Sequence, residues 1–267
     1  MRIKVMLFAV LVPFVLTCGN SWAEPVKVAA IQYRAIPLNK ALNTRNLKQM
    51  VSEAGQKGAR LIVLPEMSTT GVNIKGTPDV GSFPAETIPG PVTGEFAALA
   101  KKYKAYIVMG LAEFDRGTNK YYNSQIVIAP SGEIIGKYRK VHLYGPDNNW
   151  ASSGDLGYRS VQTELGKLGL GICYDINFPD LFDFFADNDV AIFVMSTNWI
   201  AEDAPFQYWS RLLRHKNIYF IAANNWGDDG FHFPGGSLIL SPDMKTLARS
   251  GLRSNAIIYA RIDIKKK

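Results

Sequence analysis

Three side chains that could carry covalent chemistry, Glu66, Lys140 and Cys173, each come just after an apolar run of the sequence. A thiol is a nucleophile, a carboxylate accepts a proton, and an ammonium group supplies a fixed positive charge. Acyl transfer through a covalent intermediate needs these three functions in one place. The residues lie far apart along the chain, so the fold must bring them together.

Cys173 follows the hydrophobic run Leu168–Ile172 and precedes a helical pattern that begins after Pro179. It is therefore expected at the carboxyl end of a strand, where α/β sheets build their sites. Unpaired backbone N–H groups there can lower the pKa of a thiol or hold an oxyanion. Gly169 and Gly171 are costly inside a strand, and they predict a close approach by another backbone or a ligand. A buried cysteine with a purely structural role is the alternative.

Glu66 follows the apolar segment Leu61–Leu64 and a proline. Partial burial there would raise the pKa of its carboxyl group and make it a usable general base. An ordinary acid in a loop or at a helix start is the alternative. Lys140 lies in one stretch with Lys137 and Arg139, so a solvated basic edge is the alternative for this lysine.

The three histidines, His142, His215 and His232, have no metal-ligand spacing between them, so no metal is expected. We interpret them as surface or hydrogen-bonded structural residues. A papain-like pair of Cys173 with one histidine is the competing enzymatic interpretation.

Apolar runs recur along the chain, and several are continuous, which is typical of strands covered on both faces. The predicted strands are Val26–Ile31, Leu61–Leu64, Tyr106–Leu111, Gln125–Ala129, Leu168–Ile172, Ala191–Met195, Tyr219–Ala222, Ser237–Leu240 and Ile257–Ile262. Helical patterns lie around Leu47–Ala54, after Pro91, after Pro179, and from about Pro205 to Asn217. Strands interleaved with helices predict a layered α/β domain. The stretch from residue 106 to 137 resembles consecutive strands joined by polar turns, which favours mixed sheets.

The N-terminal 23 residues have the features of a secretory signal peptide. Arg2 and Lys4 are followed by the apolar stretch Val5–Thr17, and the small residues Ser21 and Ala23 precede the expected cleavage point. The apolar stretch is too short to span a bilayer comfortably. We therefore expect a signal peptide at 1–23, one domain at 24–267 and a periplasmic or secreted protein. An uncleaved anchor and a lipid anchor on Cys18 are the alternatives.

The composition of the 267 residues, 47% hydrophobic and 20% charged, is typical of one soluble globular domain. It excludes a disordered chain, a coiled coil and a small disulfide scaffold. The net charge of +7 is spread along the chain apart from a terminal run of three lysines, so no nucleic-acid partner is expected. Cleavage would leave Cys173 as the single cysteine, and an unpaired thiol in an exported protein suggests a chemical role.

Three motifs occur in the order Leu-Pro-Glu66, Tyr-Arg-Lys140-Val-His-Leu and Gly-Ile-Cys173-Tyr-Asp. Together with the opening segment 26–32, Tyr122-Asn-Ser124 and Ser196-Thr-Asn-Trp199, they resemble the nitrilase superfamily of carbon–nitrogen hydrolases over the whole domain 24–267. The resemblance implies an α-β-β-α sandwich of mixed sheets, commonly paired through its outer helices as a homodimer or higher homo-oligomer. It also implies a Glu-Lys-Cys triad that needs no cofactor.

The resemblance further implies a role for each site residue. Cys173 would attack the carbon of a small amide or nitrile, and Glu66 would relay protons. Lys140 and the backbone N–H of Tyr174 would stabilise the oxyanion. Asp147 stands where many members have a second glutamate, and it is expected to orient groups rather than to react. The pocket wall is expected to include Trp150, Asn198 and Trp199.

Two departures from the family pattern affect the choice of substrate. Many members have an arginine at the position of Asn177 and an acid where Arg214-His-Lys216 lies, so the pocket wall or the subunit contact is expected to differ. The interpretation is an exported amidase-like hydrolase that releases ammonia or an amine. An N-carbamoyl-amine hydrolase, a nitrilase, an acyl transferase on the same triad, and a catalytically silent binding module are the alternatives.

Overall fold

The computed structural model describes residues 25–72, 84–201 and 205–264. The predicted signal peptide at 1–23 and the alternative lipid site at Cys18 lie outside the described residues. Within the described ranges, no helix combines the length and the apolar character that a membrane span requires.

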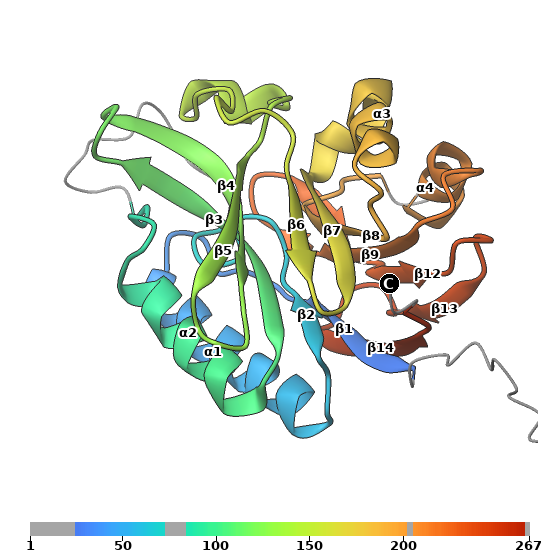
Figure 1. The fold of residues 1–267 in the computed structure, drawn as a ribbon. Helices are drawn as coiled ribbons and strands as arrows, with labels where there is room; N and C mark the ends of the chain where they lie inside the picture. The colour runs from blue at the N-terminus through green and yellow to red at the C-terminus, as the bar shows by residue number, and fades with distance from the viewer. Residues whose placement is uncertain (1–24, 73–83, 202–204, 265–267) are drawn as a thin grey trace, which may run out of the picture.

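The first sheet has six strands in the order β14-β1-β2-β3-β4-β5 (Figure 1). Their bounds are Val26–Gln32 for β1, Leu61–Val63 for β2, Tyr106–Asp115 for β3, Lys120–Ile128 for β4, Ile134–Arg139 for β5 and Ala256–Ile262 for β14. The neighbours β1, β2 and β3 are parallel, and the other pairs are antiparallel. The sheet is therefore mixed, as the sequence predicts.

The second sheet repeats this plan with the strand order β13-β12-β9-β8-β7-β6. Its bounds are Ser160–Thr163 for β6, Gly166–Ile172 for β7, Ile192–Thr197 for β8, Tyr219–Asn224 for β9, Leu238–Leu240 for β12 and Thr246–Arg249 for β13. The central strands β7, β8 and β9 are parallel, and the outer pairs are antiparallel. A separate ribbon pairs β10, Trp226–Asp228, with β11, His232–Pro234.

Helices cover the outer face of each sheet, which gives the four layers α-β-β-α (Figure 1). The helices are α1 (Lys40–Gln56) and α2 (Pro91–Tyr103) on the first sheet, and α3 (Pro179–Asp187) and α4 (Pro205–Leu213) on the second. A proline begins three of these helices, at the position where its missing N–H costs nothing. The described chain thus forms a single α/β domain.

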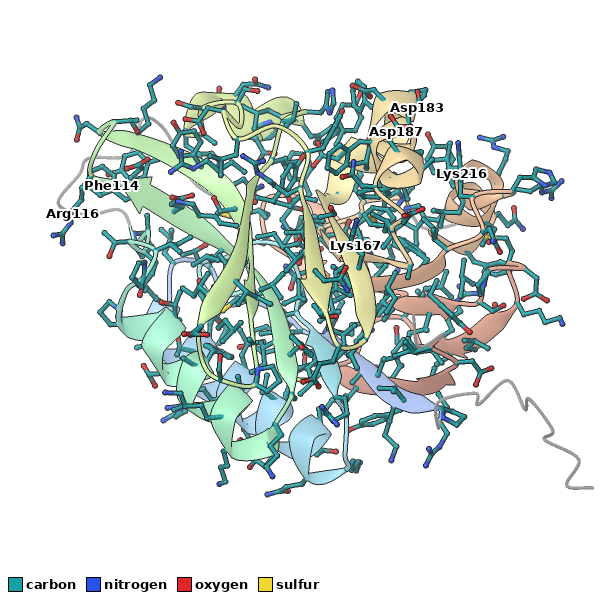
Figure 2. All side chains as sticks on the ribbon, in the orientation of Figure 1. Phe114, Arg116, Lys167, Asp183, Asp187 and Lys216 are labelled. Carbon is teal, nitrogen blue, oxygen red and sulfur yellow. The ribbon has the colours of Figure 1, made fainter. Side chains whose placement is uncertain are left out.

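Alternation along the strands builds the core on both faces of each sheet. Leu61 and Val63 of β2 lie between the sheets, whereas Ile62 faces the helices, and each such buried aliphatic side chain contributes about 1.5–3 kcal/mol. The helices are amphipathic. Helix α3 buries Phe182 and Phe185 against its sheet, whereas its Asp183 is exposed (Figure 2). Every predicted strand overlaps a strand of the structure.

Two predictions about local structure are wrong. The fourth helix ends at Leu213 rather than near Asn217, because His215 and Asn217 adopt left-handed backbone angles that a right-handed helix cannot contain. Gly169 and Gly171 admit neither a backbone nor a ligand. A Cβ at these positions would lie 2.6 Å from a ring atom of Phe185 and 2.8 Å from one of Phe193, so the glycines make room for aromatic side chains.

Candidate active site

The fold brings the three predicted side chains to neighbouring strand ends. Glu66 follows β2 and Lys140 follows β5 in the first sheet, while Cys173 follows β7 in the second. The ammonium Nζ of Lys140 lies 2.8 Å from Oε1 of Glu66, and both side chains are only 2% exposed. Cys173 is a free thiol, 9% exposed, and it lines a cavity. The site therefore lies where the two sheets face each other.

A glycine in β3 allows the backbone of Glu66 to come close. A Cβ at Gly110 would lie 2.6 Å from Cα of Glu66. Backbone hydrogen bonds fix the segment on both sides, because the N–H of Leu64 donates to Val108 at 2.8 Å and that of Ser68 to Gly110 at 3.1 Å. The carboxylate is consequently held on rigid strand ends rather than on a free loop.

Cys173 lies on a sharp turn between β7 and the short 3₁₀ helix η2, Cys173–Asn177. Its φ of 45° is in the left-handed region, which residues other than glycine rarely adopt. The fully buried Asp175 holds this turn, because its carboxylate accepts from the N–H of Ile172 at 3.0 Å and from the hydroxyl of Tyr138 at 2.8 Å. It also accepts from the N–H of His142 at 3.0 Å. Asp175 therefore joins the Cys173 turn to the segment that follows Lys140.

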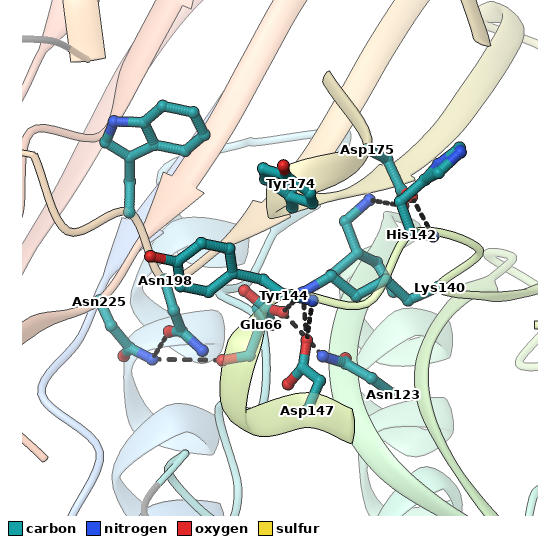
Figure 3. Close-up of polar contacts among 12 residues, drawn as sticks. Glu66, Asn123, Lys140, His142, Tyr144, Asp147, Tyr174, Asp175, Asn198 and Asn225 are labelled. Atoms are coloured by element: carbon teal, nitrogen blue, oxygen red, sulfur yellow. Dashed lines mark hydrogen bonds and ion pairs between the residues drawn. The ribbon is translucent and has the colours of Figure 1, made fainter. Parts of the chain in front are cut away.

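Lys140 lies between two carboxylates, as Figure 3 shows, with Nζ 2.6 Å from Oδ2 of Asp147 on its second side. Asp147 belongs to the 3₁₀ helix η1, Gly145–Asn149, and its shorter side chain reaches the lysine. Asn123 donates to Oε1 of Glu66 at 2.7 Å. The other oxygen, Oε2, is buried and has no hydrogen-bond partner among the described residues. One oxygen of Glu66 is thus fixed by donors, and the other is available for a proton.

The electrostatics of the pair differ for the two partners. Burial raises the pKa of Glu66 above its ordinary value, although the charge of Lys140 opposes this. Burial alone would lower the pKa of Lys140, but the negative charges of Glu66 and Asp147 raise it well above its ordinary value. Lys140 therefore stays charged, and Glu66 is the group that can exchange a proton.

Burial, and then the charge of Glu66, raise the pKa of the Cys173 thiol to about 12. The charge of Lys140 and the polar groups of the Thr197 side chain and the Asn198 backbone act in the opposite direction. The resting thiol is accordingly protonated at neutral pH. Attack by sulfur must therefore be accompanied by removal of its proton.

The cavity at Cys173 has a volume of about 230 Å³. Its lining residues are Tyr144, Cys173, Tyr174, Asn177, Asn198, Trp199, Ile200, Ala201 and Tyr208. Three predicted site residues, Tyr174, Asn198 and Trp199, therefore face the thiol's cavity. Trp150 does not line it, contrary to the prediction, because its side chain packs in a separate cluster with Met67 and Ala112.

Sequence reasoning missed several polar residues that support the site. Asn123 was visible only as part of the Tyr122-Asn-Ser124 strand, and nothing in the sequence links it to Glu66. Asn225 donates to the backbone carbonyl of Glu66 at 3.2 Å and to the side chain of Asn198, as Figure 3 shows. These contacts join residues far apart in the sequence, so the only signal was an asparagine at a strand end.

The histidine alternative gains no support from the geometry. The ring of His142 stacks on Phe178 with centroids 3.4 Å apart, and its Nδ1 lies 3.2 Å from Oδ1 of Asp175. The largest effects on the pKa of Cys173 come from burial, Glu66 and Lys140, and not from a histidine. In the part of the chain that the structure describes, no group of three or more histidines, cysteines and acids could hold a metal ion.

Comparison with known proteins identifies the family. The profile of the carbon–nitrogen hydrolase family matches residues 27–266, so the chain belongs to this family of enzymes. A protein named nitrilase from Pyrococcus abyssi is 32% identical over 240 residues, which cover 90% of each chain. The omega-amidase NIT2 of Homo sapiens is 30% identical over 256 residues, which cover 90% of this chain and 89% of that protein.

Solved structures share the fold. A mutant of the amidase from Nesterenkonia sp. AN1 superposes with a TM-score of 0.80 at 19% identity, over 96% of this chain and 94% of that one. Nit3 of Saccharomyces cerevisiae, a member of the nitrilase superfamily, gives a TM-score of 0.76 at 25% identity, over 91% of each chain. The chain is thus a single-domain carbon–nitrogen hydrolase, an amidase-like enzyme with two mixed sheets flanked by helices.

Proposed function

We propose that this protein hydrolyses the carbon–nitrogen bond of a small amide through a thioester on Cys173. One observation carries the proposal. Lys140 and Asn123 both donate to one oxygen of Glu66, and its other oxygen is buried without a partner among the described residues. The charge of Glu66 also acts on the thiol of Cys173, which lines a cavity. A proton acceptor with a free oxygen, close to a protonated nucleophile, is the arrangement that thiol activation requires.

In the first half-reaction, sulfur bonds to the carbonyl carbon while its proton passes to Glu66. The carbonyl electrons move to oxygen, and Lys140 and the backbone N–H of Tyr174 stabilise this oxyanion. The amide of Tyr174 is suited to this role because it lies in the first turn of η2, where N–H groups have no partner within the helix. When the carbon–nitrogen bond breaks, Glu66 returns the proton to nitrogen, and ammonia leaves.

In the second half-reaction, Glu66 takes a proton from water, and the oxygen adds to the thioester carbon. The carbon–sulfur bond then breaks, and the proton held by Glu66 restores the thiol. The sum is amide plus water to carboxylic acid plus ammonia, with no external oxidant or reductant. Lys140 keeps its proton throughout because its pKa lies well above the ordinary value.

Ammonia release from a panel of small amides, nitriles and N-carbamoyl amines tests this function. We expect the amides to react fastest and Cys173→Ala to abolish their turnover while its melting temperature stays near that of the parent. Amide turnover that survives in Cys173→Ala would exclude the thioester route. Faster turnover of nitriles or N-carbamoyl amines would exclude the amidase assignment.

We also propose that the protein is exported and that its mature chain begins at Glu24. The charged start, the apolar stretch and the small residues before position 24 support this. Intact mass and N-terminal sequencing after expression in a bacterial host with a secretion pathway test the proposal. A full-length chain that starts at Met1 in the cytoplasm contradicts it.

A homo-oligomer paired through the outer helices is proposed as well. A groove along α4 that includes Phe206, Tyr208 and Met244 supports it, because it exposes apolar surface on the outer layer. Analytical ultracentrifugation should give at least a dimer, and a monomer at micromolar concentration contradicts this.

A further inference from the structure

We propose that the cavity beside Cys173 selects amides whose acyl chain is short, apolar and uncharged, and that it excludes chains that end in a carboxylate. The inference rests on the proposed function, because it concerns the acyl half of the substrate that Cys173 would carry. It follows from the walls of the cavity, from the charges around it and from its size.

Four of the nine residues that line the cavity are aromatic. Tyr144 and Tyr174 contact each other with ring centroids 5.2 Å apart, and Trp199 and Tyr208 with centroids 5.5 Å apart. Ile200 adds an aliphatic side chain that is 38% exposed. An acyl chain between these rings would bury apolar surface without losing a hydrogen bond to water.

No residue that lines the cavity in the described part of the chain carries a positive charge. Asn177, the neutral residue at the position where many family members have arginine, is already engaged. Its Oδ1 accepts from the hydroxyl of Tyr208 at 2.5 Å, and its Nδ2 donates to the carbonyl of Tyr174 at 2.9 Å. The guanidinium of Arg211 lies over the ring of Tyr208, 5.3 Å from its centroid, and lines the separate groove along α4.

The catalytic charges also disfavour an anion. Lys140 is shared by Glu66 and Asp147, so with both carboxylates ionised and the thiol protonated the group has a net charge of −1. A substrate carboxylate would lose its water, find no cation among the described residues that line the cavity, and be repelled by this charge. The volume of about 230 Å³ lies below the roughly 300–1,000 Å³ of pockets for larger ligands. The cavity is therefore suited to a short neutral chain.

Three linear amides with five carbon atoms each test the inference. They are pentanamide, glutaramate with a terminal carboxylate, and 5-aminopentanamide with a terminal ammonium. We expect kcat/KM for pentanamide to exceed that for glutaramate by at least about 100-fold, and to exceed that for the ammonium compound. Equal or faster turnover of either charged amide overturns the inference and leaves the hydrolase function intact. If none of the three releases ammonia from folded enzyme and the wider amide panel is also inert, the proposed function itself fails.

A charge introduced at the rim provides the matched comparison. Ile200→Arg should raise the ratio of kcat/KM for glutaramate over pentanamide by about tenfold, because it gives the carboxylate a partner. Ile200→Met, which introduces a flexible but neutral side chain at the same position, should leave this ratio unchanged. A ratio that is the same in both folded variants would show that the lack of a cation does not set the selectivity, and it would overturn the inference.

Discussion

Arg139 and Lys140 are neighbours in the chain, and both are buried among carboxylates, yet the two clusters around them differ in kind. Arg139 donates to Glu113 through two nitrogens, to Asp115 at 2.5 Å and to Asp155 at 2.8 Å. Each acid in this cluster has a partner, and none of them lines the cavity at Cys173. The Lys140 cluster instead contains a carboxylate oxygen without a partner among the described residues, and it lies next to the thiol.

The two buried glutamates show the consequence. Although burial opposes it, hydrogen bonds from Arg139, Lys137 and Ser124 hold the pKa of Glu113 below its ordinary value. Burial raises the pKa of Glu66 despite the adjacent Lys140. A fully satisfied carboxylate stabilises the fold as an anion, whereas a partly satisfied one can take up a proton during a reaction. The number of donors around a buried acid, set against the effect of its burial, therefore separates the structural cluster from the candidate catalytic one.

Replacing each glutamate by glutamine should give the largest contrast. Glu66→Gln should lower kcat by about 10⁴-fold, because Glu66 acts as acid or base in both half-reactions. Glu113→Gln should retain most of the kcat per folded molecule and lose stability at neutral pH. Steady-state ammonia release and urea unfolding measure the two effects. A comparable loss of kcat in both variants would remove the distinction between the clusters.

The two cations provide the next contrast. Lys140→Met should lower kcat by about 10²–10³-fold, the usual effect of losing an oxyanion partner. Arg139→Met should cost about 3 kcal/mol of stability, because it leaves buried acids without their partner, and the folded fraction should keep its kcat. Thermal unfolding together with kcat per folded molecule checks this pair. A stable but inactive Arg139→Met would contradict it.

Two aspartates give a smaller effect. Asp147→Asn should lower kcat/KM by about tenfold, equivalent to one charge-assisted hydrogen bond of about 1.5 kcal/mol, because Lys140 loses its second acceptor. Asp147→Glu should keep the ion pair and most of the activity. Asp115→Asn is the matched control from the structural cluster, and its kcat/KM should stay near the wild-type value. Similar losses in Asp147→Asn and Asp115→Asn would mean that Asp147 has no special role.

The titration of Cys173 should show the most subtle difference. The negative charge of Glu66 raises the pKa of the thiol and the positive charge of Lys140 lowers it, so Glu66→Gln should lower that pKa and Lys140→Met should raise it. Thiolate absorbance near 240 nm against pH reports the midpoint. Glu113→Gln, the control, should leave the midpoint unchanged. Shifts in the same direction for Glu66→Gln and Lys140→Met would contradict the proximity of the three groups.

Much of the fold could be predicted because each strand and helix carries its own apolar pattern. Leu61, Ile62 and Val63 are all apolar, as expected of a strand that packs against one core on each face. Prolines indicate where three of the helices begin. The two strand glycines were misinterpreted because their neighbours, Phe185 and Phe193, come from other segments of the chain. Contacts between segments are not encoded in the local pattern.

The candidate site divides in the same way. Glu66, Lys140 and Cys173 could be located because the position of each, after a strand, has a chemical meaning on its own. Asn123 and Asp175 were missed because their importance lies in which distant groups they touch. Trp150 was misplaced because the sequence does not give the path of the loop between Lys140 and β6, which packs this residue with Met67 and Ala112.

The most direct test of the proposed mechanism is the intact mass of the enzyme quenched in acid during turnover of pentanamide. The thioester route predicts a fraction of the chain heavier by one pentanoyl group minus a hydrogen, located on Cys173 by peptide mapping and absent from Cys173→Ala. Turnover by wild-type enzyme with the acyl group on any other side chain would contradict it.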